Sequence, residues 1–196
     1  MKNKNLLSDT EERQSVYGKK NKVYSAKEYA YLSVFVALGI AAQLVLSVVL
    51  GVEVVSVLFI SYAYVFGARR GMLAATAFSL LRQFLFGFFP VVLVLYLLYF
   101  NGLAAFFGYL GEKNRRAMES RQLPIVMVFS CIATLCFTLL DNVITPLFFG
   151  YTWEQTKVYF TASIAVAVAH VISVGVSVFF LFLPFKRIFI ILKRGL

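Results

Sequence analysis

The sequence alternates long apolar segments with short polar ones, and this alternation is the feature that most constrains its fold. Hydrophobic residues make up 61% of the 196 residues, and the mean hydropathy is +0.82. Soluble globular domains are far less apolar. A crossing helix needs roughly 20 residues to span about 30 Å of hydrocarbon, so the chain has room for about six. We therefore predict an all-α membrane protein, a compact bundle of six transmembrane helices.

Charged breaks, glycines and prolines divide the chain into predicted parts. Residues 1–28 are polar and basic, do not resemble a cleaved signal peptide, and are expected to form a cytoplasmic tail; residues 29–196 form the membrane domain. The spans are expected at about 28–49, 54–66, 72–88, 90–111, 124–145 and 158–183. The second is short for a full crossing, which favours a tilted or partly non-helical segment. The four prolines, Pro90, Pro124, Pro146 and Pro184, all fall at predicted boundaries.

The distribution of basic residues predicts the orientation of the bundle. Arg69 and Arg70 lie in an expected tight turn, residues 67–71, between the second and third spans. Of the 19 lysines and arginines, 17 fall on one side: in the tail, in this turn, in the loop 112–122 and after Pro184. The positive-inside rule makes that side the cytoplasm and places both termini there. The net charge of +10 thus has a membrane explanation, and no nucleic-acid partner is expected.

Polar side chains inside the spans mark the candidate site, because an ionisable group in lipid costs several kcal/mol and usually faces protein, water or ligand. Arg82, Asp141 and Gln43 fall in the outer third of their spans, and Asn101 and His170 near mid-depth. This convergence favours a cavity that opens outward and binds a substrate.

Each of these residues also has a structural interpretation. Arg82 and Asp141 can form a salt bridge that satisfies only itself, Asn101 can form an interhelical hydrogen bond, and His170 can be a packed imidazole. Trp153, the only tryptophan, can stack on a planar ligand or anchor the outer loop at the membrane interface.

Other chemistry has little support in the sequence. The chain lacks a nucleophile elbow, a His-Glu-x-x-His zinc motif and a phosphate-binding loop, so no enzymatic activity and no cofactor or metal is expected. Cys131 and Cys136 lie in one predicted span and are interpreted as packing residues. No voltage-sensing helix or ion filter indicates a channel.

Small residues four apart line one face of the first span, at Ala37 and Ala41, and one face of the sixth, at Ala165, Ala169, Ser173 and Ser177. Such stripes allow helices to approach closely in lipid. By themselves they do not distinguish an internal contact from a surface that binds a partner.

Two motifs carry a resemblance to a known family: Ala37-Leu38-Gly39-Ile40-Ala41 in the first span and Phe66-Gly67-Ala68-Arg69-Arg70-Gly71 before the third. Together with six expected spans and both ends inside, they resemble the substrate-binding S component of an energy-coupling factor (ECF) vitamin transporter, over roughly residues 29–190.

The resemblance implies a function and partners. In that family the S component captures a vitamin or related micronutrient from outside the cell, and the small face that maps onto Ala37 and Ala41 packs against a transmembrane coupling protein. Two cytoplasmic ATPases drive uptake. The expected location is the cell membrane. Two rival functions remain open, a structural or assembly membrane protein without a transported ligand and a self-sufficient small-molecule carrier.

Overall fold

The computed structural model describes residues 26–46, 54–114 and 119–195, with the backbone alone for residues 119 and 120. Most of the predicted N-terminal tail and the predicted outer loop 50–53 lie outside the described residues. The chain divides into two compact units, Met1–Tyr31 and Leu32–Leu196, and the first contributes only residues 26–31 to the described part.

The described residues form six α-helices and no strand, as the all-helical prediction expects. They are α2 (Ala26–Leu46), α3 (Val54–Phe66), α4 (Ala68–Phe86), α5 (Pro90–Lys113), α6 (Glu119–Phe149) and α7 (Trp153–Arg194). Four of them, α2, α5, α6 and α7, are long and apolar enough to cross a membrane, and α3 is a shorter apolar helix. The protein is therefore a multi-pass helical membrane protein.

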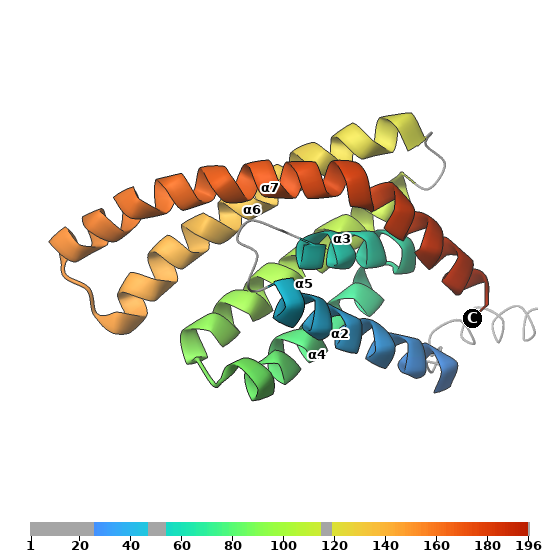
Figure 1. The fold of residues 1–196 in the computed structure, drawn as a ribbon, viewed down its shortest axis with the longest axis horizontal. Coiled ribbons are helices and arrows are strands. Elements are labelled where there is room, and N and C mark those ends of the chain that lie inside the picture. Colours follow the sequence, from blue (N-terminus) through green and yellow to red (C-terminus); the bar gives the residue numbers. More distant parts are fainter. Residues whose placement is uncertain (1–25, 47–53, 115–118, 196) are drawn as a thin grey trace, which may run out of the picture. The chain divides into compact units, whose positions relative to one another are not determined.

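Helix α3 occupies the core of the second unit. It is apolar all round, which is typical of a helix enclosed by others, and residues 56–64 are all buried. It packs against α4, α5 and the last part of α7, while α6 and α7 lie antiparallel along each other (Figure 1). The predicted short length of the second span is confirmed. The segment is α-helical throughout, so it is not partly non-helical.

Aromatic side chains hold α2, α3 and α7 together. The ring of Phe35 on α2 stacks on Tyr62 of α3, with centroids 4.0 Å apart, and meets Phe59 edge-on at 5.0 Å. Phe189 of α7 lies against both Phe35 and Tyr62. Such pairs add about 0.5–1.5 kcal/mol each beyond the area that they bury.

The predicted arginine turn is wrong in its extent. Gly67 alone separates α3 from α4, with a φ of 92°, and α4 begins at Ala68, so Arg69 and Arg70 lie in the first turn of a helix. A single glycine suffices because it adopts this left-handed conformation without strain. The backbone N–H of Gly71 already donates to the carbonyl of Gly67, at 3.0 Å.

The prediction that every proline marks a span boundary is also wrong. Pro90 does begin α5, but Pro124 and Pro146 lie inside α6 and Pro184 lies inside α7. Pro124 and Pro146 stand within the first or last six residues of α6, and membrane helices tolerate proline where neighbouring groups satisfy the freed backbone. Helix α7 bends in its last third (Figure 1), the region that contains Pro184.

Candidate functional site

Arg82 lies at the centre of a polar cluster that joins three helices. Its Nε donates to Oε1 of Gln43 on α2 at 3.0 Å, and Nε2 of Gln43 donates to the hydroxyl of Tyr96 on α5 at 2.8 Å. The guanidinium also lies 4.4 Å from the ring centroid of Tyr96 and 4.6 Å from that of Phe86. A cation–π contact is worth about 0.5–2 kcal/mol, more as the cation is desolvated, and Arg82 is half-buried. The structure thus brings the predicted residues Arg82 and Gln43 together.

Two buried hydrogen-bond donors on α4 have no acceptor among the residues that the structure describes. Nη1 of Arg82 and Nε2 of Gln83 are buried, and neither has a hydrogen-bond partner among the described residues. The Gln83 side chain is fixed from its other end, because its Oε1 accepts from the backbone N–H of Phe89 at 3.2 Å. A buried guanidinium donor without a partner suits a group that offers acceptors, such as a carboxylate, a phosphate or a carbonyl.

Asp141 forms a second polar cluster, between α6 and α7. Its two oxygens accept from the hydroxyls of Thr145 and Tyr159, each at 2.6 Å. Next to it, Nδ2 of Asn142 donates to the hydroxyl of Ser163 at 2.7 Å. Arg82 and Asp141 therefore have separate partners, and within the described ranges no ion pair connects the two.

The two clusters approach each other through aromatic rings. Phe137 of α6 contacts Tyr96 and Tyr99 of α5, with ring centroids 6.5 and 4.7 Å apart. Asp141 follows Phe137 by four residues, which is about one helical turn. Asp141 thus lies one turn along α6 from the ring that contacts the Arg82 cluster.

The other predicted substrate residues have separate surroundings. Asn101 accepts from the Thr76 hydroxyl of α4 at 3.1 Å, which is the interhelical hydrogen bond of the alternative interpretation. His170 is half-buried on α7. Trp153 begins α7 with 72% of its surface exposed, and Lys157 lies 5.3 Å from its ring centroid. None of these three has a hydrogen bond or ring contact with the Arg82 cluster among the described contacts.

The predicted docking residues lie on the surface. Ala37 and Ala41 are both exposed on α2, whereas Gly39 between them is buried, and a Cβ added there would meet Phe59 and Phe78 at 3.5 Å. The small-residue face of α2 is thus not used for packing within the described part of the second unit. It is available to lipid or to another protein.

An apolar groove of about 420 Å³ runs between α6 and α7, and the Asn142–Ser163 pair is part of its lining. A second cavity, of about 640 Å³, lies where α3, α5, α6 and α7 end or begin. None of the six predicted substrate residues lines either of them.

The sequence interpretation missed two tyrosines that complete the clusters, Tyr96 and Tyr159. Tyr96 stands in the middle of an otherwise aliphatic run, and Tyr159 stands four residues before Ser163 on one face of α7. A phenol inside an apolar segment needs a hydrogen-bond partner, which is the signal that was available. Cys131 donates to the Val171 carbonyl at 3.9 Å, but Cys136 is exposed, so the prediction that both cysteines are packing residues is wrong for Cys136.

In the ranges 26–46, 54–114 and 119–195, no group of three His, Cys, Asp or Glu side chains is arranged to hold a metal ion. Comparisons of the chain with protein-family models, with curated proteins and with solved structures found no match.

Proposed function

We propose that this protein captures a small, water-soluble micronutrient, such as a vitamin, from outside the cell and serves as the substrate-specific subunit of an ECF transporter. A transmembrane coupling protein and two cytoplasmic ATPases would supply the energy, and both termini would be cytoplasmic. The chain itself would perform no catalytic step.

The observation that carries this proposal is the Arg82 cluster with its unused donor. A guanidinium that contacts two rings and donates one hydrogen bond within the bundle is oriented before any ligand arrives, which lowers the entropy cost of binding. Its Nη1, which is buried without a hydrogen-bond partner among the described residues, can donate to an acceptor-bearing group of a ligand. A carboxylate, phosphate or carbonyl is common among water-soluble nutrients, and Arg recognises such groups with a rigid fork.

The structural rival also has an observation in its favour. The amide of Gln43 accepts a hydrogen bond from α4 and donates one to α5, and so connects both helices to α2. The same bonds are expected if the cluster only stabilises the bundle. The two functions differ in what the loss of Arg82 does: the rival expects a less stable bundle and no other change.

The decisive measurement is mass spectrometry of organic molecules that co-purify with the protein, followed by thermal-shift assays with a vitamin panel. We expect one compound to raise the unfolding midpoint of the wild-type protein. A ligand present at 100 times its Kd stabilises the folded state by about 2.7 kcal/mol. The variant Arg82→Gln should lose this shift.

Lys157→Gln provides the matched control, since the Lys157 side chain is exposed and its ion pair and cation–π contact, with Glu154 and Trp153, lie within the first turn of α7. It should retain the full ligand shift. If no compound co-purifies and none of the panel shifts the wild-type midpoint, the capture function is rejected; if Arg82→Gln lowers the ligand-free midpoint but keeps the shift, Arg82 is structural.

A further inference from the structure

Arg82 has only uncharged partners among the residues that the structure describes. Its Nε donates to the amide oxygen of Gln43, and its guanidinium contacts the rings of Tyr96 and Phe86. These contacts orient the guanidinium, but an amide and two rings carry no net charge. Within its cluster, the positive charge of the half-buried Arg82 is therefore not balanced by a carboxylate.

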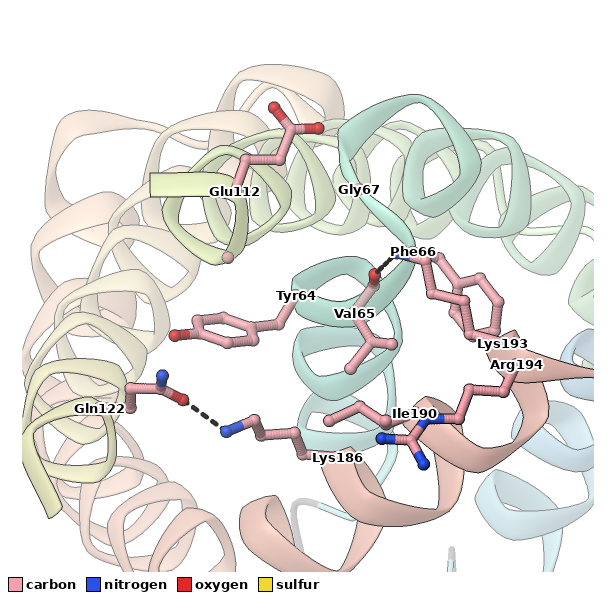
Figure 2. Close-up of a pocket in the computed structure, with 11 residues that line it drawn as sticks. Tyr64, Val65, Phe66, Gly67, Glu112, Gln122, Lys186, Ile190, Lys193 and Arg194 are labelled. Atoms are coloured by element: carbon pink, nitrogen blue, oxygen red, sulfur yellow. Dashed lines mark hydrogen bonds between the residues drawn. The ribbon is translucent and has the colours of Figure 1, made fainter. Parts of the chain in front are cut away.

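The described carboxylates of the second unit lie elsewhere. Asp141 accepts from two hydroxyls, of α6 and α7, and Glu154 forms an ion pair within the first turn of α7. Glu112 lies beside Gly67, the residue before α4 (Figure 2), whereas Arg82 stands about 22 Å further along that helix. Within the described ranges, no acidic side chain pairs with Arg82.

The dipole of α4 does not replace the missing negative charge. The negative end of a helix acts mainly within its last turn, and the last turn of α4 contains no basic residue, because Arg82 stands just before it. Ionised side chains within membrane spans are costly and are usually paired. An arginine that is oriented but not paired with an acid therefore indicates a negative partner that comes from outside the chain.

We propose that the substrate of this protein is an anion whose carboxylate or phosphate group binds at Arg82. This inference rests on the proposed capture function and narrows it. A neutral carbonyl would accept a hydrogen bond from Nη1, which has no partner among the described residues, but it would not balance the charge. A carboxylate or a phosphate does both, and the fork of arginine donors matches the geometry of either group.

Gln43 is the positioning residue of this site. Its Nε2 donates to the hydroxyl of Tyr96 at 2.8 Å, so the oxygen is the end of the amide that faces Nε of Arg82, at 3.0 Å. The amide thus fixes one edge of the guanidinium and leaves its charge unbalanced. Glutamate in the same place would fix that edge equally well, but it would also bring the negative charge that we assign to the substrate.

The first test compares anionic compounds with neutral analogues of similar shape on the purified wild-type protein. The pairs are nicotinate and nicotinamide, biotin and biotinamide, pantothenate and panthenol, and riboflavin phosphate and riboflavin. Any compound that co-purifies is identified by mass spectrometry and is included. We expect at least one anion to raise the unfolding midpoint and its neutral analogue to bind about tenfold more weakly or worse.

The outcomes separate this inference from the function on which it rests. A neutral compound that binds as tightly as its anionic analogue, or a co-purified substrate without an anionic group, overturns the inference and leaves the capture function in place. If no compound co-purifies and none of the probes shifts the midpoint, both are rejected.

The second test places a negative charge next to Arg82 without adding bulk, in the variant Gln43→Glu. We expect it to bind the anion about tenfold more weakly or worse, because the new carboxylate already balances the guanidinium. The matched control is Gln155→Glu at the exposed start of α7, where glutamate can accept the same hydrogen bond from the backbone N–H of Thr152. The control should bind the anion as the wild type does.

A neutral variant, Gln43→Met, separates the charge from the loss of hydrogen bonds. It removes both bonds of the amide and adds no charge, so it should bind the anion more tightly than Gln43→Glu does. Equal binding by Gln43→Glu and the wild type, or equal losses in the two Gln43 variants, overturns the proposal. If Gln43→Glu does not fold, the comparison of anions with neutral analogues on the wild type decides the question.

Discussion

At the scale of single residues, two glycines of α5 determine how closely the core helices approach. A Cβ at Gly108 would stand 2.2 Å from the backbone nitrogen of Ala68, and one at Gly111 would stand 2.0 Å from the carbonyl oxygen of Tyr64. Contacts this short with backbone atoms cannot be relieved by rotating a side chain. Helix α5 therefore lies directly on the junction between α3 and α4.

Replacing Gly108 by alanine should accordingly destabilise the protein, although alanine is the better helix former. We expect a loss of about 1–3 kcal/mol from the forced backbone shift, measured as the change in unfolding midpoint in detergent. The matched control is Gly102→Ala in the same helix, where an added Cβ meets nothing within 4 Å. That variant should gain about 0.5–1 kcal/mol, and equal effects of the two substitutions would contradict the packing argument.

At the scale of helices, the sequence predicts that a helix is present better than it predicts the residues at which the helix begins and ends. The bounds of α3 match their prediction residue for residue, because a charged break precedes this run and Gly67 follows it. The ends of α6 and α7 do not, because a proline's local preference against helix was outweighed by the packing of the surrounding turns. Propensity at one residue is a weak guide where a long apolar helix gains from continuing.

The prediction at the scale of helices concerns the exposed face of α2. If Ala37 and Ala41 bind a coupling protein, Ala37→Trp or Ala41→Trp should leave the fold and ligand binding unchanged and stop uptake in vesicles that contain the complete transporter. Both side chains are exposed, so added bulk meets no neighbour among the described helices. The control is Leu38→Trp, because the Leu38 side chain is 52% exposed and lies on an adjacent face of α2. Undiminished uptake by both alanine variants removes the docking assignment.

At the scale of the molecule, the positive-inside rule makes a prediction about sidedness. In a background where Cys131 and Cys136 are serine, Glu154→Cys should react with a membrane-impermeant maleimide on intact cells. Arg69→Cys should react only after the membrane is opened. Both positions are exposed. Labelling of Arg69→Cys on intact cells would contradict the predicted orientation. It would also contradict the assignment of the Arg82 cluster to the outer side of the membrane.

The candidate site was only partly predictable at this scale. Depth along each span follows from counting residues, and it correctly groups Arg82 with Gln43, which the structure joins by a hydrogen bond. Neighbours around the bundle do not follow from counting, so the sequence could not reveal that Asp141 faces Tyr159 of α7 and that Asn101 faces Thr76 of α4. Part of the lining of the cavity of about 640 Å³ comes from Lys186 to Arg194 of α7 (Figure 2), beyond Pro184, where the predicted sixth span ended.

The packing of α3 against α7 includes a hydrogen bond from Lys193 to the Val65 carbonyl, in the last turn of α3, which has a consequence for biosynthesis. The two residues are 128 positions apart in the sequence. At the usual rate of translation, roughly 5–20 residues per second, the end of α3 leaves the ribosome roughly 6–25 s before its partner exists. During that interval α3, the most enclosed of the described helices, lacks both its packing against α7 and the hydrogen bond that caps its last turn. Lipid or the insertion machinery must shelter α3 until synthesis of α7 is almost complete.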